Sequence, residues 1–243
     1  MRRVLGFVLL LGSSLGFAAP IRIMPLGDSI TAGYPVPGGY RTRLYYLLST
    51  EGFSFDFVGS MTDNSNFPAL PDPDHEGHSG WQTVNISANI SGWLTTSTPD
   101  VILLHIGTND ISAGVGSAVA LSRLDILLSQ ITSQEPNAQL FVASVVPRWD
   151  SNEATSQVYN AGIPGLVSSY TSQGKHVYFV DIHSAVGASD LADGIHPNQG
   201  GYDKMANVWN GAIQSNVVVP EPATVTAIAL GLGFFMNRRK RRR

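Results

Sequence analysis

The sequence predicts an α/β fold in which a parallel β-sheet lies between two layers of helices. Short apolar runs alternate along the chain with longer segments whose apolar residues recur at helical spacing. The run at residues 101–106 (VILLHI) is continuously apolar, as strands buried on both faces of a parallel sheet are. This alternation predicts a three-layer α/β/α sandwich, and the apolar runs predict a five-stranded parallel sheet.

The first half of the chain supplies two strands, one helix and a long loop. Residues 21–25 form an apolar run that ends in a Gly-Asp-Ser turn. Residues 40–51 carry apolar side chains at helical spacing, and Gly52 follows in the position of a C-cap. Residues 55–58 are a second apolar run. The segment 61–80 contains three prolines and two glycines, which predicts a loop, and loops of this length are usually functional.

The second half continues the same alternation after the strand at 101–106. Apolar side chains at helical spacing predict three further helices, and two more apolar runs predict the fourth and fifth strands. These expected elements are helices at 117–134, 153–173 and about 201–215, and strands at 140–146 and 177–182.

The composition limits the classes of protein and partner. The chain has 243 residues, 43% of them hydrophobic, which suits one domain with a full core and excludes disorder as its main state. It has no cysteine, which excludes a disulfide scaffold, a thiolate zinc site and a cysteine nucleophile. Residues 20–219 carry 7 basic and 17 acidic side chains, a net charge of −10. Nucleic acid and anionic lipid are therefore poor partners.

The first 18 residues have the pattern of a secretory signal peptide. Arg2 and Arg3 precede an apolar run, and Gly16 and Ala18 place small residues before a cleavage site. The alternative is a first buried strand or helix, which explains neither the arginines nor the small residues at the end.

Residues 218–243 have a second three-part pattern. Val219-Pro220-Glu221-Pro222 precedes a short apolar run, and six basic residues end the chain. The pattern resembles the PEP-CTERM sorting signal, which implies export to the cell surface or extracellular matrix of a bacterium with an outer membrane. It also implies transient membrane association and an exosortase-type processing enzyme as partner. The alternatives are a plain tail anchor and a nucleic-acid-binding patch.

Four short polar motifs follow the strands. They are Gly27-Asp28-Ser29, His78-Ser79-Gly80-Trp81, Gly107-Thr108-Asn109-Asp110 and Asp193-Gly194-Ile195-His196. Each has an ordinary structural explanation by itself; Asp-Ser after Gly, for example, is a common helix N-cap. Because ligands of parallel sheets bind at the carboxyl ends of the strands, the four motifs are expected to meet at one edge.

Together these residue types suit acyl transfer. Ser29 is the candidate nucleophile, because the His196 imidazole can take its proton. Asp193 lies three residues before His196 and can hold the ring from its other nitrogen. The Ser29 amide, the Gly80 amide and the Asn109 side chain are candidate donors for an oxyanion hole. This chemistry needs no metal and no organic cofactor.

The four motifs resemble the SGNH (GDSL-type) hydrolase family. The name-giving positions correspond to Ser29, Gly80, Asn109 and His196, and Asp193 occupies the family's Asp-x-x-His position. The resemblance spans most of the chain between the terminal segments. It implies a flavodoxin-like SGNH-hydrolase fold and assigns these residues the roles given above.

The hydrolase domain is expected at residues 19–217. The α/β-hydrolase fold is disfavoured, because the serine motif lacks the second glycine of G-x-S-x-G and the acid lies beside the histidine. Further blocks resemble carbohydrate esterase family 3, which contains acetylxylan esterases. They are Gly38-Gly39-Tyr40-Arg41, Asp56-Phe57-Val58-Gly59-Ser60, the segment 75–81 and the segment 105–110.

These observations predict a secreted serine esterase that removes O-acetyl groups from polysaccharide. One alternative is another SGNH esterase, such as a lipase, a thioesterase or a peptidoglycan O-acetylesterase. A second alternative is a non-catalytic protein that binds the surface matrix.

For several other residues, a structural role is preferred to a functional one. His75, Glu76 and His78 lack the spacing of a zinc protease, and the acids around residue 74 lack that of an EF-hand. His105 is expected to be a hydrogen-bonded core histidine. Trp81, Trp93, Tyr34 and Tyr40 could stack on sugars, but packing is the preferred explanation for most of them.

Overall fold

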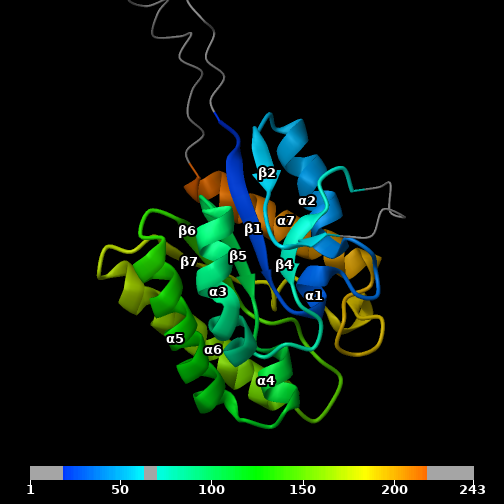
Figure 1. Ribbon diagram of the computed structural model, residues 1–243. Helices are drawn as coiled ribbons and strands as arrows, with labels where there is room; N and C mark the ends of the chain where they lie inside the picture. The colour runs from blue at the N-terminus through cyan, green and yellow to red at the C-terminus, as the bar shows by residue number, and fades with distance from the viewer. Residues whose placement is uncertain (1–18, 63–69, 218–243) are drawn as a thin grey trace, which may run out of the picture. The chain divides into compact units, whose positions relative to one another are not determined.

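The computed structural model describes residues 19–62 and 70–217 (Figure 1). Within these residues the sheet has seven strands, and every strand pair in it is parallel except one. The strands are β1 (Ile21–Gly27), β2 (Phe55–Phe57), β3 (Met61–Thr62), β4 (Asp74–Gly77), β5 (Val101–His105), β6 (Gln139–Ala143) and β7 (Val177–Val180). The exception is the short strand β3, which pairs with β4 in the antiparallel direction. The sheet order is β3-β4-β1-β5-β6-β7, and β2 also pairs with β1.

Strands β2 and β4 both pair with β1 in parallel, on successive stretches of that strand. Ile21 of β1 pairs with Phe55 of β2, whereas Leu26 pairs with Glu76 of β4. The chain leaves β1 after β2 and returns to it at β4, so the two short strands together act as one strand position. The five parallel positions then have the flavodoxin-like order 2-1-3-4-5. The predicted fold class is confirmed.

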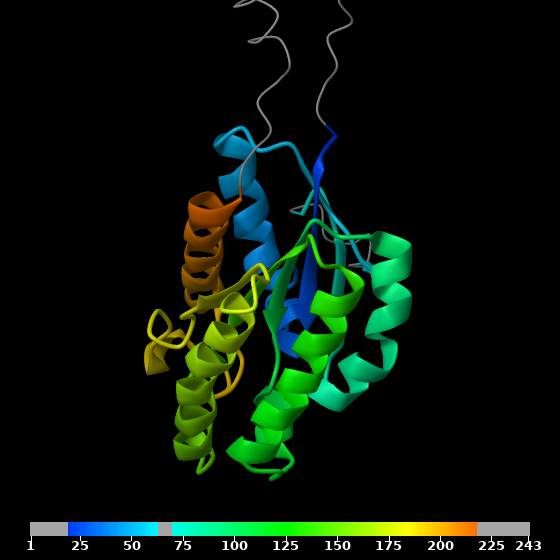
Figure 2. The ribbon, with the colours of Figure 1, turned by 90° about the vertical axis from the view of Figure 1, so that its left-hand side faces the viewer.

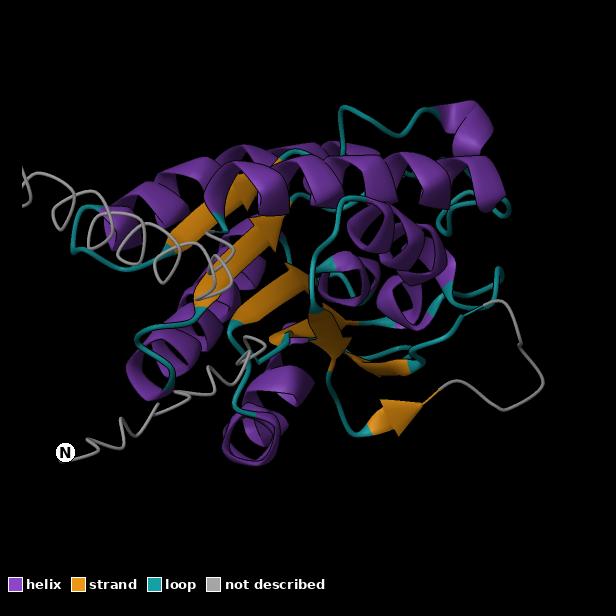
Figure 3. Cartoon of the chain, turned by 90° about the horizontal axis from the view of Figure 1, so that it is seen from above, coloured by secondary structure: helices purple, strands orange, loops and turns teal. Residues whose placement is uncertain are grey.

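Helices cover both faces of the sheet, as Figures 2 and 3 show. Helices α2 and α7 pack on one face, and α3, α5 and α6 pack on the other. The helices are α1 (Ser29–Ala32), α2 (Gly39–Thr50), α3 (Thr83–Ser97), α4 (Thr108–Ser112), α5 (Ser117–Gln134), α6 (Glu153–Thr171) and α7 (Gln199–Asn216). Among the helices of the described residues, none is long and apolar enough to cross a membrane.

Strand β5 shows how one strand serves both hydrophobic cores. Val101 and Leu103 point into the core under α2 and α7, whereas Ile102 and Leu104 point into the core under α3, α5 and α6. All four side chains are at most 1% exposed. Because successive side chains of a strand point to opposite faces, a strand in this central position must be apolar throughout.

The structure corrects two expectations and leaves others outside its range. The segment 61–80 is not entirely a loop, since it contains β3 and β4. Helix α3 was not expected, because Ser, Thr and Asn interrupt its apolar residues; burial of Ile86, Ile90 and Leu94 stabilises it. The expected signal peptide and the PEP-CTERM-type segment lie outside the described residues.

Replacement of Leu104 by alanine should lower the free energy of unfolding by about 2–5 kcal/mol, because it removes buried methyl groups and leaves a cavity. Chemical denaturation measures this loss. Ile126→Ala is the control, since Ile126 is 56% exposed on α5 and its loss should cost only about 0.5 kcal/mol. Equal losses for the two variants would contradict the assignment of the core.

Candidate active site

Ser29 lies at the point where β1 ends and α1 begins. Asp28 is the N-cap of α1, and its Oδ1 accepts a hydrogen bond of 2.9 Å from the Ile30 amide. Ser29 is therefore the first residue of the helix, where an amide has no acceptor within the helix. Its side chain is only 8% exposed. The N-cap explanation of this motif and the nucleophile explanation are thus compatible, because they concern adjacent residues.

Ser29, His196 and Asp193 form one chain of hydrogen bonds. Ser29 Oγ lies 2.9 Å from His196 Nε2, and His196 Nδ1 lies 2.8 Å from Asp193 Oδ2. An ionised carboxylate can only accept hydrogen bonds, so in the neutral ring Nδ1 carries the proton and Nε2 accepts from the serine. This is the connectivity of a Ser-His-Asp triad.

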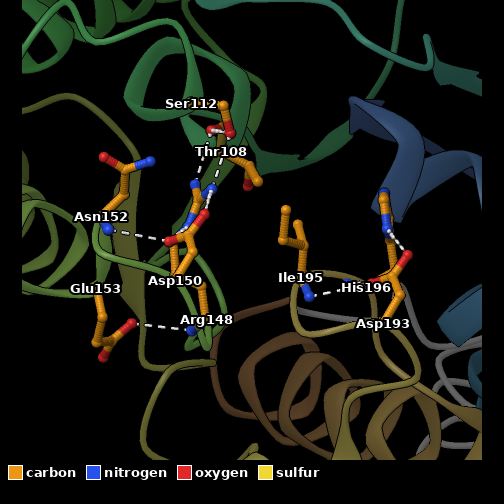
Figure 4. A network of polar contacts seen from close by, with 9 residues as sticks. All are labelled: Thr108, Ser112, Arg148, Asp150, Asn152, Glu153, Asp193, Ile195 and His196. Atoms are coloured by element: carbon orange, nitrogen blue, oxygen red, sulfur yellow. Dashed lines mark hydrogen bonds and ion pairs between the residues drawn. The ribbon is translucent and has the colours of Figure 1, made fainter.

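The Asp193 carboxylate is held in its ionised form by its own turn. Burial by itself would raise its pKa, but hydrogen bonds from the amide and ring of His196 and from the Ile195 amide outweigh burial and lower the pKa. Asp193 Oδ1 accepts from these two amides at 2.8 and 3.0 Å (Figure 4). A carboxylate that stays ionised can stabilise the imidazolium that forms when His196 takes a proton.

Gly80 lies in a tight turn directly after β4. The Trp81 amide donates to the His78 carbonyl at 3.1 Å, and Gly80 between them has a φ of +82°, which favours glycine. The His78 amide donates to the Gly27 carbonyl, which holds this turn against the end of β1. Within residues 19–62 and 70–217, the Gly80 amide has no acceptor. It is available to a ligand.

Asn109 is joined to the same turn. Its Nδ2 donates to the Trp81 carbonyl at 2.9 Å, which uses one of its two amide hydrogens and leaves the other available. The structure therefore brings the five residues that the motifs predicted to the carboxyl edge of the sheet. Ser29, His196 and Asp193 are joined by hydrogen bonds to one another, and Asn109 is hydrogen-bonded to the turn that contains Gly80.

Helix α4, which carries Asn109, is held from two sides by buried charged groups. On one side, Asp110 is fully buried and accepts from the Thr83 amide and hydroxyl at 2.8 Å and from Arg123 at 2.7 Å. On the other side, the buried Arg148 donates to the Thr108 carbonyl and to Ser112 Oγ (Figure 4). These contacts fix the direction in which Asn109 points.

The turn that contains Gly80 is supported by a stack of three rings. The ring of His78 lies 4.3 Å from that of Trp81 and 4.7 Å from that of Trp93 (centroid distances), and the two indoles lie 6.0 Å from each other, so each ring adjoins the other two. Its Nε2 lies 2.8 Å from Glu76 Oε2, and the buried Glu76 also binds Ser60. The two tryptophans therefore pack against this turn, as the sequence favoured. Glu76 is engaged in this network, and no cluster suited to a metal ion occurs within the described residues.

Two further expectations have mixed outcomes. His105 is fully buried, as expected, but neither ring nitrogen has a hydrogen-bond partner among the described residues. Burial lowers its pKa to about 4, so the ring is neutral. Tyr40 is also fully buried and packs on Trp209, whereas Tyr34 is exposed and lies against the ring of His196.

Sequence reasoning did not identify Asp110, Arg148 and the pair Glu76–His78 as supports of the site. Asp110 stands inside the motif of Asn109, and Glu76 stands in the block 75–81 with Gly80, so their proximity to these two residues was a signal. Arg148 is 39 positions from Asn109, and only the fold brings it to α4.

Comparison with known proteins gives the family. Residues 26–204 match the model of the GDSL-like Lipase/Acylhydrolase family. This match covers more than half of the chain. The chain belongs to this family, and the SGNH (GDSL-type) prediction is confirmed.

Individual relatives agree with this assignment. The chain is 38% identical to a multidomain esterase of Ruminococcus flavefaciens over 221 residues, which are 79% of this chain and 28% of that protein. It thus spans little more than a quarter of that relative. It resembles a family 3 carbohydrate esterase of Clostridium thermocellum with 41% identity and a TM-score of 0.71, covering 81% of this chain and 96% of the other. It also resembles a carbohydrate esterase family 3 structure from Talaromyces cellulolyticus, with 32% identity and a TM-score of 0.72. This similarity covers 80% of this chain and 97% of the other.

Replacement of Asn109 by alanine should lower kcat for a small ester by about 10²–10³-fold, because one oxyanion donor is lost. Steady-state kinetics with 4-nitrophenyl acetate measures the change. Asn89→Ala, on the exposed side of α3, is the matched control and should leave kcat unchanged. A kcat within about twofold of the parent protein for Asn109→Ala would show that this side chain does not stabilise the transition state.

Asp28 predicts a pH dependence of stability. Burial raises its pKa to about 7, against the lowering effect of the hydrogen bond from the Ile30 amide. The folded state therefore holds this proton more tightly than the unfolded chain, so its stabilising contribution is complete below about pH 4 and is lost as the pH rises through about 7. The contribution is up to about 4 kcal/mol.

Asp28→Asn cannot ionise and should lack this loss of stability between about pH 4 and 8. Urea denaturation across this range measures the free energy of unfolding at each pH. Asp203→Asn, on the partly exposed surface of α7, is the control and should keep the parent's pH dependence. Parallel curves for Asp28→Asn and the parent would contradict the buried-carboxyl explanation.

Proposed function

We propose that this protein is a serine esterase that removes O-acetyl groups from polysaccharide. The observation that carries the proposal is the hydrogen-bonded chain Asp193–His196–Ser29 beside the amides of Ser29 and Gly80 and the side chain of Asn109. A nucleophile, a base and preorganised donors at one edge of a sheet are the groups that acyl transfer requires.

The reaction has two stages. His196 Nε2 takes the hydroxyl proton as Ser29 Oγ attacks the acetyl carbonyl, and the tetrahedral oxyanion is stabilised by the donors of Ser29, Gly80 and Asn109. His196 then gives the proton to the departing sugar oxygen, which leaves an acetyl ester on Ser29. Water attacks this ester with His196 again as base, and acetate and the free serine are produced.

Three observations support an esterase that acts on an acetylated sugar; the second of them supports the esterase class alone. Two structures that the chain resembles at 41% and 32% identity are named as family 3 carbohydrate esterases. The curated relative at 38% identity is named as a multidomain esterase. The net charge of −10 over residues 20–219 disfavours anionic lipid surfaces, which would suit a phospholipase.

The proposed place of action is outside the cell. The signal-peptide pattern of residues 1–18 and the PEP-CTERM-type pattern of residues 218–243 support export followed by sorting to the surface or matrix. Immunoblotting of cytoplasmic, membrane and extracellular fractions with an antibody to the protein tests this location. Protein found only in the cytoplasm would contradict it.

The parent protein should release acetate from acetylated xylan, and Ser29→Ala should reduce the rate by about 10⁴-fold or more, because the nucleophile is lost. Acetate release and labelling by a fluorophosphonate measure the two properties. Ser122→Ala, an exposed serine of α5, is the matched control and should keep both. Equal acetate release by the parent and Ser29→Ala would exclude Ser29 as nucleophile.

A series of 4-nitrophenyl esters separates the proposal from its alternatives. Activity should be highest with acetate and fall with acyl length. A maximum at about eight carbons or more would favour a lipase or long-chain thioesterase, because a longer chain buries more apolar surface in a matching site. Failure of the parent protein to react with the fluorophosphonate would favour the non-catalytic alternative.

A further inference from the structure

Two exposed aromatic side chains lie beside the Asp193–His196 turn. Tyr34 is 56% exposed, and its ring lies edge-to-face at 4.9 Å from the imidazole of His196. Trp149 is 58% exposed, and its indole is so close to Gly194 that a Cβ atom there would lie 3.0 Å from Cε3. Both rings therefore adjoin the segment that would supply the base.

The backbone of Trp149 is fixed although its side chain is exposed. Its amide donates to the Gly194 carbonyl at 2.9 Å. On one side, the guanidinium of the buried Arg148 donates to both carboxylate oxygens of Asp150 and to the Thr108 carbonyl of α4 (Figure 4). On the other side, Asp150 also accepts from the Asn152 amide. The indole therefore projects from a rigid segment joined to both parts of the site.

Tyr34 is fixed in a similar way. Its amide donates to the Ser29 carbonyl at 3.0 Å, and its own carbonyl accepts from the hydroxyl of the buried Tyr202. Both aromatic rings thus have restrained main chains, so little conformational entropy is lost when a ligand covers them. Rigid aromatic side chains provide large contact areas at low entropic cost.

The exposure of these two rings does not stabilise the folded protein. An indole gains stability by burial, as Trp209 does at 0% exposure, whereas the exposed half of Trp149 contributes nothing to the core. A flat, half-wetted aromatic surface suits a ligand with an apolar face and a polar rim. A sugar ring has this character, since its C–H groups form the faces and its hydroxyls can stay in water. A flexible acyl chain would instead need apolar walls on all sides.

We infer that Trp149, with Tyr34, binds a sugar ring of the polymer next to the acetylated unit. The two residues then determine the preference for polymeric over small esters. This inference rests on the proposed function and names the part of the substrate that the same site would contact outside the acetyl group. Binding energy from such a remote contact improves kcat/KM for the polymer and is absent for an ester without sugar.

The test compares two substrates for each variant. For Trp149→Ala the ratio of kcat/KM for acetylated xylan to kcat/KM for 4-nitrophenyl acetate should fall about tenfold, and Trp149→Phe should recover part of it. Val158→Ala is the matched control, because Val158 is also 58% exposed but lies on α6, and its ratio should equal that of the parent. Thermal denaturation of each variant monitors folding.

A second measurement is independent of turnover. In the Ser29→Ala background, calorimetry with acetylated xylo-oligosaccharides should show weaker binding when Trp149→Ala is added. An unchanged ratio and unchanged binding would overturn the inference while leaving the proposed function intact. Equal losses on both substrates would also overturn it, since Trp149 would then only support the Asp193–His196 turn. A parent protein that hydrolyses 4-nitrophenyl acetate but neither binds nor deacetylates xylan would overturn both proposals.

Discussion

Burial of β1 and β5 on both faces is the constraint from which the arrangement of the site follows. Both strands are central and lie between two hydrophobic cores, so their interior positions accept almost no polar side chain. Polar chemistry is therefore displaced to the positions where the strands end. Because parallel strands all end at the same edge, Ser29 after β1, the Gly80 turn after β4 and Asn109 after β5 are collected there. His196 and Asp193 reach this edge from the segment that precedes α7.

The loops at this edge are held by charged groups that are themselves buried. Asp28 caps α1, Asp110 ties α4 to α3 and α5, and Arg148 ties the opposite side of α4 to the segment before α6. Asp110 and Arg148 each have several hydrogen-bond partners, which offset the cost of their burial. Asp28 accepts one hydrogen bond, from the Ile30 amide, and its Oδ2 has no partner among the described residues. An oxyanion donor is effective only when it is oriented before the reaction, so in the proposed mechanism these distant contacts would act through Asn109 and the N-terminus of α1.

Much of this architecture could be predicted from the sequence where local pattern and tertiary environment agree. The helix expected at 117–134 coincides with α5, and the strand 101–106 agrees with β5 within one residue. Prediction was wrong for β4, because three of its four residues are buried although two of them, His75 and Glu76, are polar. The strand pairs with β1, and Glu76 accepts from Ser60, 16 residues earlier in the chain; no local pattern reveals either contact. Trp149 was missed for the same reason, since its proximity to Gly194 depends on two distant loops.

The direction of the strands also determines from which side the domain can be held. The described chain enters at the start of β1 and ends with α7, and both points lie at the end of the sheet opposite α1 and α4 (Figures 1 and 2). Seven residues of β1 at about 3.3 Å each span about 23 Å, so Ile21 lies at least this far along the chain direction from Ser29. A fusion partner or solid support joined to either point would therefore not obstruct the opposite edge. The proposed substrate, a bulky or insoluble polymer, should therefore still reach the site in an immobilised form of the domain.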